Sequence, residues 1–224
     1  MGDMRFLAGN VRGNELTMST FNGNVANVVH ATVSKDGKKM KGKLSMYDAF
    51  VDEFTAEKVP DFDLASPTRM KKGKKQLSIP ELKGYKGKPV IVTVMATWCP
   101  ICNDFTPFLS KLYGDYHPKG LEVLMLAYDL SEDEKSNAEK IEEFKKKYSI
   151  TWEIQQRPTT PQTWLPNMPP EIEGWMGFPV IAWVRPDGSV YKVYSGYYGP
   201  AAQPEHDEIN RQFTQWTDEL LAGK

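Results

Sequence analysis

An unbroken run of apolar, mostly β-branched residues extends from Val90 to Met95 and predicts a strand buried on both faces. A second apolar run, Leu121 to Tyr128, predicts another buried strand. Between the two we expect a helix from Cys99 to about Tyr116. Pro107 lies inside that helix and should kink it, because proline removes one main-chain donor. This part of the chain therefore predicts an α/β core.

The pattern after the second strand predicts a further helix, a hairpin and a last helix. Ile141, Phe144 and Tyr148 recur at helical spacing in the polar stretch 131–148, which indicates an amphipathic helix. Ser131 and Glu134 form the capping box expected at its start. The elements expected after it are a strand at 180–184, a turn at 185–188, a partner strand at 189–194 and a helix from about 205 to 221.

Residues 157–176 are too rich in proline for a helix or a strand, and they predict a long loop. Long ordered loops in compact domains are usually functional or unstructured. Trp164, Trp175 and Met176 in this loop fit either a plug over the core or a surface that reads the substrate.

The first 57 residues have a different, β-rich pattern. Strands are expected at 15–19, 25–33 and 41–46, and the Asn-Gly and Asp-Gly pairs between them favour hairpin turns. We expect a meander of three or four strands that packs on the rest of the chain or ends a larger β domain. The predicted organisation is therefore a β-rich segment at 1–57 and a main domain at 58–224.

Composition and charge narrow the choice of partners. The net charge of the 224 residues is -1, so no overall field would recruit nucleic acid or an anionic membrane. The longest apolar run is too short to cross a bilayer, and the first thirty residues contain no apolar core of a signal peptide. Because Met1-Gly2-Asp3 leads directly into strand-like sequence, we expect a longer precursor whose targeting segment or membrane anchor precedes this chain.

The two cysteines of the chain, Cys99 and Cys102, lie three residues apart at the expected helix start. First-turn N–H groups and the helix dipole there favour a thiolate, so Cys99 is the predicted nucleophile and Cys102 the resolving thiol. A disulfide between them closes a tiny loop and stabilises little, which favours redox chemistry over a structural role. A zinc site is not expected, because there is no second Cys-x-x-Cys and the three histidines are scattered. We therefore expect no cofactor beyond the redox-active disulfide.

Several motifs together resemble a known family. Trp-Cys-x-x-Cys after a buried strand, a proline five residues later, and Gly177-Phe178-Pro179-Val180 are similar to the thioredoxin fold. The segments 60–64, 82–89 and 120–123 resemble the TlpA-like thiol-disulfide oxidoreductases, and the resemblance extends from about residue 58 to the end. It implies a thioredoxin-like α/β fold, a central mixed sheet flanked by helices, with the helix 131–148 and the proline-rich loop as insertions.

The resemblance also implies a substrate surface beside the cysteines. Pro179 should follow a cis peptide bond and expose the backbone of Phe178 to an extended substrate chain. Trp98 should form a rim of the site, and Pro100 is counted with these predicted substrate contacts.

The chain departs from the family pattern at the acid expected to assist Cys102. Thr93 stands on the central strand where reductases often carry an acid or amide. Phe105, with Asp104 beside it, stands where many relatives have glutamate. Other acids that could replace it in the inserted region are Glu132, Glu134 and Glu139. The Pro-Ile pair between the cysteines donates no polar hydrogen, which argues against a strongly oxidising site.

The function expected from these features is the reduction of protein disulfides in an extracytoplasmic compartment. The partners are then a protein disulfide substrate and an upstream thiol electron donor, without nucleic acid. One alternative is a peroxiredoxin-like peroxidase, although Ala96 stands where that family needs threonine or serine. Another is a binding or chaperone module that holds a partner through the aromatic loop.

Overall fold

The computed structural model describes residues 7–21, 26–46, 50–59, 67–129, 133–157, 168–174 and 177–223. The chain divides into two compact units, Met1–Leu64 and Ala65–Lys224. Within the described residues, every helix is too short or too polar to cross a membrane.

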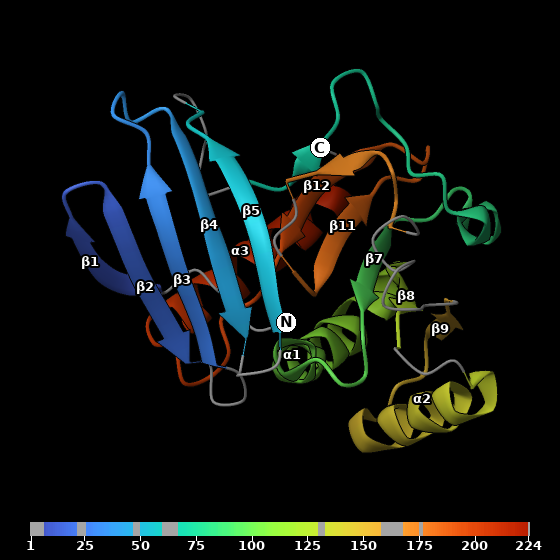
Figure 1. The fold of residues 1–224 in the computed structure, drawn as a ribbon. Helices are drawn as coiled ribbons and strands as arrows, with labels where there is room; N and C mark the ends of the chain where they lie inside the picture. The colour runs from blue at the N-terminus through green and yellow to red at the C-terminus, as the bar shows by residue number, and fades with distance from the viewer. Residues whose placement is uncertain are drawn as a thin grey trace. The chain divides into compact units, whose positions relative to one another are not determined.

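The first unit is an antiparallel sheet of five strands in sequence order (Figure 1). Its strands are β1 (Ala8–Arg12), β2 (Glu15–Phe21), β3 (Ala26–Val33), β4 (Lys39–Met46) and β5 (Phe50–Glu57). The predicted count of three or four strands was wrong. Every residue of β1 is exposed, so this edge strand lacks the alternation of buried and exposed positions that reveals a strand in sequence.

Alternation is clear in the middle of this sheet. Val29 and Ala31 of β3 are buried, and the residue between them is exposed. Val29 pairs with Met18 on β2 and with Leu44 on β4, so apolar side chains from three strands share one face. The first unit therefore has an apolar face and a polar one.

The second unit is built around a mixed sheet in the order β12-β11-β7-β8-β9. Strands β7, β8 and β9 are parallel, and β11 is antiparallel to both β7 and β12. A separate two-stranded ladder joins β6 and β10. The elements are β6 (Arg69–Met70), η1 (Pro80–Tyr85), β7 (Val90–Met95), α1 (Pro100–Tyr116), η2 (His117–Lys119), β8 (Glu122–Ala127), α2 (Glu134–Tyr148), β9 (Glu153–Gln156), β10 (Ile172–Glu173), β11 (Val180–Val184), β12 (Val190–Ser195) and α3 (Glu205–Leu221).

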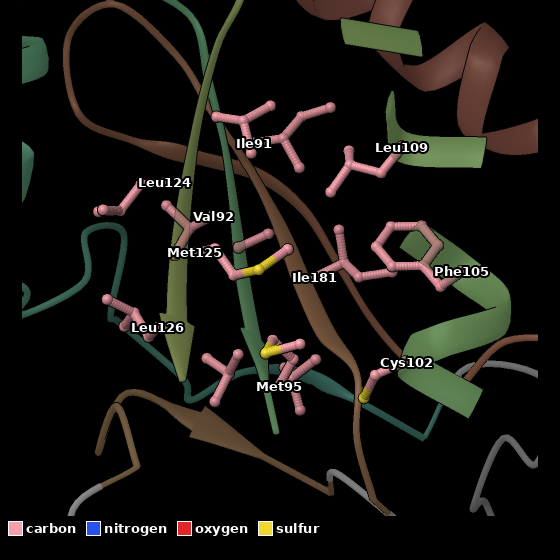
Figure 2. Packing of buried hydrophobic residues seen from close by; sticks show 14 of the residues in the cluster. Ile91, Val92, Met95, Cys102, Phe105, Leu109, Leu124, Met125, Leu126 and Ile181 are labelled. Carbon is pink, nitrogen blue, oxygen red and sulfur yellow. The ribbon is translucent and has the colours of Figure 1, made fainter. Parts of the chain in front are cut away.

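The core lies around β7, whose six residues are all buried. Figure 2 shows residues of β7 with Leu124 and Met125 of β8, Ile181 of β11 and Leu109 of α1. Burial of each aliphatic side chain contributes about 1.5–3 kcal/mol to stability. The thioredoxin-like fold expected from the sequence is confirmed.

Helices α1 and α3 are joined to the sheet and to each other by polar and aromatic contacts. The indole Nε1 of Trp183 on β11 donates to Thr217 Oγ1 on α3 at 3.1 Å. Tyr116 at the end of α1 donates its hydroxyl to Asp218 at 2.7 Å. The rings of Phe105 and Phe213 meet edge to face with centroids 6.1 Å apart. These contacts fix the helix that begins at the cysteines.

The start of α2 differs from the expected capping box. The N-cap is Asp133, whose carboxylate accepts a hydrogen bond from Lys135 N at 3.0 Å, and Glu134 is the first helical residue. Aspartate caps a helix as well as serine does, and Asp133 directly precedes the first helical residue, so Asp133 is the N-cap. Ser131, like Trp164, Trp175 and Met176 of the proline-rich loop, lies outside the described residues.

Candidate functional site

The two cysteines lie on a turn that connects β7 to α1, and we name residues 96–102 the redox turn. Cys99 N donates to Ala96 O at 3.1 Å, which closes the turn just before the helix. Cys99 is the N-cap of α1 and Pro100 is its first residue, a position where proline's missing N–H costs nothing. The helix therefore begins where the sequence predicts, with Pro107 inside it.

The cysteines are free thiols, and both residues are buried. Cys102 N lies 3.3 Å from Cys99 Sγ and donates a hydrogen bond to it. Figure 2 shows the Cys102 side chain on the side of α1 that faces the strands, near Met95 and Ile181. The first-turn N–H that should stabilise a Cys99 thiolate is therefore in place.

The electrostatics distinguish the two sulfurs. A hydrogen bond from the Cys102 thiol lowers the pKa of Cys99; burial raises it, and the Cys102 main-chain N–H lowers it again, with a net lowering. Burial raises the pKa of Cys102 well above its ordinary value, and the hydrogen bond and charge of Cys99 raise it further. Of the two sulfurs, Cys99 is therefore the one whose surroundings favour ionisation.

The predicted substrate contacts gather beside the redox turn. Val180 on β11 pairs with Val94 on β7, which places the preceding Phe178-Pro179 near the carboxyl end of β7. The Phe178–Pro179 peptide bond is cis, as expected. Trp98 is 40% exposed and meets the buried Phe178 ring edge to face, with centroids 6.3 Å apart. Pro100 is exposed at the first position of α1.

Asp129 is the site residue that the sequence reasoning missed. Its side chain is buried, and Oδ1 accepts hydrogen bonds from Thr97 N and Thr97 Oγ1, each at 2.8 Å. Its other oxygen, Oδ2, is buried without a partner among the described residues. Burial raises the pKa of this carboxyl, and the two hydrogen bonds from Thr97 only partly oppose that effect. A usable signal existed, because Asp129 is the first charged residue after the second apolar run.

The acids considered from sequence lie elsewhere. Glu134 and Glu139 are exposed on α2, and Glu132 lies outside the described residues. Asp104 is an exposed residue close to Gly199; desolvation raises the pKa of its carboxyl, while the charge of His206 lowers it. Thr93 is buried in β7, and its hydroxyl has no partner among the described residues.

Phe105, at the position where relatives often have glutamate, is buried in the core. Its ring meets that of Tyr197 edge to face with centroids 5.2 Å apart. This position therefore serves packing and supplies no proton.

The described part of the chain contains no group of three or more His, Cys, Asp or Glu side chains placed to hold a metal ion. Its three histidines have separate partners. His30 bonds Thr17, His117 bonds the carbonyl of Leu121, and His206 bonds the carbonyl of Tyr198.

Comparison with known proteins shows which families the chain is similar to. The model of the AhpC/TSA family matches residues 55–159. The thiol-disulfide oxidoreductase ResA of Bacillus thuringiensis is 41% identical over 49 residues, which cover 22% of this chain and 28% of that protein. ResA of Geobacillus kaustophilus is 32% identical over 114 residues, which cover 49% of this chain and 58% of that protein.

Among solved structures, a secreted disulfide oxidoreductase of Mycobacterium tuberculosis aligns with a TM-score of 0.40 at 19% identity. That alignment covers 58% of this chain and 83% of the other. The matches to the two ResA proteins span less than two thirds of either relative. The segment that carries the Cys-x-x-Cys pair at the start of α1 therefore matches the AhpC/TSA family, and the chain is similar to the ResA thiol-disulfide oxidoreductases.

Proposed function

We propose that this protein reduces disulfide bonds in other proteins, with Cys99 as the attacking thiolate and Cys102 as the resolving thiol. The observation that carries the proposal is the difference between the two sulfurs. Hydrogen bonds from Cys102 lower the pKa of Cys99, whereas burial raises that of Cys102. A thiolate and a protonated reserve thiol within one helical turn are what stepwise thiol exchange requires.

The exchange proceeds in two substitutions at sulfur. The Cys99 thiolate attacks one sulfur of the substrate disulfide, forms a mixed disulfide and releases the other sulfur as a thiolate. Cys102 then loses its proton and attacks Cys99 Sγ, which forms the Cys99–Cys102 disulfide and releases the second substrate sulfur. Two electrons pass to the substrate, and an upstream dithiol must return them.

Trp98, Pro100, Phe178 and Pro179 are the proposed substrate contacts. Two observations support this proposal: the exposed Trp98 ring contacts the ring of Phe178, and Pro100 is exposed on the redox turn. An extended chain across these residues would bring its disulfide to Cys99. Replacement of Trp98 by alanine should raise KM for a protein disulfide while leaving alkylation of Cys99 by a small reagent unchanged.

The proposed setting is extracytoplasmic, with a protein disulfide as substrate and a membrane-bound or soluble thiol protein as donor. It rests on the resemblance to TlpA-like proteins. The proposed division of labour assigns the chemistry to residues 58–224 and leaves 1–57 as an accessory segment.

Two measurements test the proposal. The first is turnover of insulin disulfides with a chemical reductant, which Cys99→Ser should abolish and Cys102→Ser should arrest at the mixed disulfide. The second is the reduction potential of the pair in defined thiol/disulfide buffers, followed by tryptophan fluorescence. A value near that of thioredoxin, about -270 mV, supports a reductase, and one near about -120 mV would contradict it.

The same assays address the two alternatives. A peroxidase would turn over hydrogen peroxide, but Ala96 supplies no hydroxyl, and the nearby Thr97 hydroxyl donates to Asp129 at 2.8 Å. A binding module would keep its function in Cys99→Ser. We therefore expect no peroxide turnover and complete loss of activity in that variant.

A further inference from the structure

Asn103 directly follows the second cysteine, and its side chain forms four hydrogen bonds. Its amide nitrogen donates to the carbonyls of Thr97 and Cys99, each at 2.9 Å. Its Oδ1 accepts from the hydroxyl of Tyr148 at 2.7 Å and from Lys147 Nζ at 3.1 Å. Both hydrogens and both lone pairs of the amide are therefore in use.

The orientation of this amide follows from the chemistry of its partners. Main-chain carbonyls only accept hydrogen bonds, so the side that faces Thr97 and Cys99 must be the NH₂ group. The ammonium of Lys147 only donates, so the side that faces α2 must be the oxygen. Asn103 thus joins two segments as a donor to one and an acceptor from the other.

These bonds hold the backbone of the redox turn. Cys99 O accepts from both the main-chain N of Asn103, at 3.0 Å, and its side-chain amide. Thr97 is held at both ends, because its carbonyl accepts from Asn103 and its N–H donates to Asp129. With these carbonyls fixed, the N–H of Cys102 stays aimed at Cys99 Sγ.

The hydrogen bonds from Lys147 and Tyr148 of α2 to Asn103 Oδ1 strengthen the bonds of Asn103 to the redox turn. Hydrogen bonds that end on the amide oxygen polarise the amide and strengthen its N–H groups as donors. Tyr148 is partly buried and should contribute more than the exposed Lys147, whose charge is screened by solvent.

We propose that Asn103 is a positioning residue, which couples the end of α2 to the redox turn and keeps Cys99 in the geometry that favours its thiolate. The inference rests on the proposed redox function and deepens it, because it assigns the inserted helix a part in setting thiol reactivity.

The test uses the full chain and three variants, Asn103→Ala, Tyr148→Phe and Ser110→Ala. Ser110→Ala is the matched control, since Ser110 Oγ donates to the carbonyl of Tyr148 at 3.3 Å and joins the same two helices without contacting the redox turn. The reduced proteins are alkylated with iodoacetamide across a pH series, and mass spectrometry locates the label.

In Asn103→Ala we expect the pH midpoint for Cys99 alkylation to move upward and the rate at neutral pH to fall about tenfold, as loss of two ordinary hydrogen bonds allows. Tyr148→Phe should move both in the same direction by a smaller amount, about threefold in rate, and Ser110→Ala should move neither. An unchanged pH profile in folded Asn103→Ala, or an equal shift in Ser110→Ala, would overturn the proposal.

If Asn103→Ala does not fold, the comparison of Tyr148→Phe with Ser110→Ala decides, because the phenylalanine variant keeps Asn103 itself. Alkylation needs no protein substrate, so it is independent of insulin turnover. A wild-type protein that fails to reduce insulin would contradict the proposed function, while a flat pH profile across the variants would contradict the role of Asn103.

Discussion

At the scale of single residues, the proposed chemistry depends on the different surroundings of Cys99 and Cys102. Cys99 accepts a hydrogen bond from the N–H of Cys102, 3.3 Å away, whereas the Cys102 side chain extends toward the core. The helix N-terminus stabilises negative charge on the first sulfur, and the apolar surroundings disfavour it on the second.

This difference predicts the order of alkylation in the reduced protein. Because the pKa of Cys99 is lowered and that of Cys102 is raised, Cys99 has the larger thiolate fraction at any given pH. Cys99 should react with iodoacetamide at least about tenfold faster than Cys102, since each pKa unit corresponds to a tenfold change in thiolate. Mass spectrometry of timed samples locates the label, and equal labelling of both cysteines would contradict the assignment.

Asp129 predicts a pH dependence of stability. Burial raises the pKa of its carboxyl in the folded state, so its ionised form disfavours folding. This penalty is absent below the unfolded pKa and is fully present above the raised, folded one. Asp129→Asn can keep the acceptor for Thr97 and removes the charge, so the variant should be more stable than wild type at neutral pH.

The advantage of Asp129→Asn should shrink as the pH falls through the raised pKa of Asp129 and vanish below the unfolded value. Urea unfolding at a series of pH values measures it. Glu139→Gln, an exposed site on α2, is the control and should show no such trend. A constant difference between Asp129→Asn and wild type at every pH would show that Asp129 is not the titrating group.

At the scale of elements, the ends of the helices supply the residues that form and surround the candidate site. Helix α1 begins at the cysteines, and α2 ends at Tyr148, whose hydroxyl reaches Asn103 on α1. The end of α2 also contains Ser149, the one non-glycine residue with positive φ in the described ranges, at 53°. The left-handed conformation at a helix C-terminus favours glycine.

Ser149→Gly should therefore stabilise the protein by about 0.5–1 kcal/mol, because glycine adopts this conformation without a steric penalty. Ser149 is exposed, so loss of its side chain removes little packing. Ser149→Ala is the matched control and should not gain stability, since alanine keeps the Cβ. Chemical denaturation measures all three proteins, and an equal gain in both variants would contradict the explanation.

At the scale of the whole molecule, the chain forms two compact units with different architectures. The second unit contains both cysteines and a mixed sheet with helices, and the first is a five-stranded sheet. Within the first unit, Gly42 of β4 has no room for a side chain. A Cβ there would lie 2.6 Å from the Cβ of Ala31 and 2.8 Å from the ring of Phe54.

Gly42→Val should destabilise the first sheet by about 1–3 kcal/mol through overpacking. The reduction potential of the cysteine pair should stay unchanged, because Cys99 and Cys102 belong to the other unit. Lys43→Val is the control, since the neighbouring Lys43 is exposed and forms a surface ion pair with Glu53 at 3.0 Å, worth little. A shift in potential in Gly42→Val alone would show that the first unit influences the redox site.

Much of the main domain could be predicted from local pattern. The run at 90–95, the Cys-x-x-Cys pair and the hairpin after Pro179 each carry their signal within a few consecutive residues. Hydrophobic burial and helix-end electrostatics act on such short segments, so the strand, the start of the helix and the proposed nucleophile can be inferred from them. Strand β1 was missed because all of its residues are exposed. Strand β5 does alternate, with Phe54 and Ala56 half-buried between exposed neighbours, so its pattern could have been found.

The surroundings of the cysteines were decided only when distant segments came together. Asp129 meets Thr97 across 32 positions of sequence, and Tyr148 meets Asn103 across 45. The sequence does not show whether a given aspartate or tyrosine is solvated or buried. Its pKa and hydrogen bonds depend on neighbours that only folding brings close. The choice of Cys99 as the proposed nucleophile thus rests on local sequence, whereas the groups that position it and shift its pKa are set by tertiary structure.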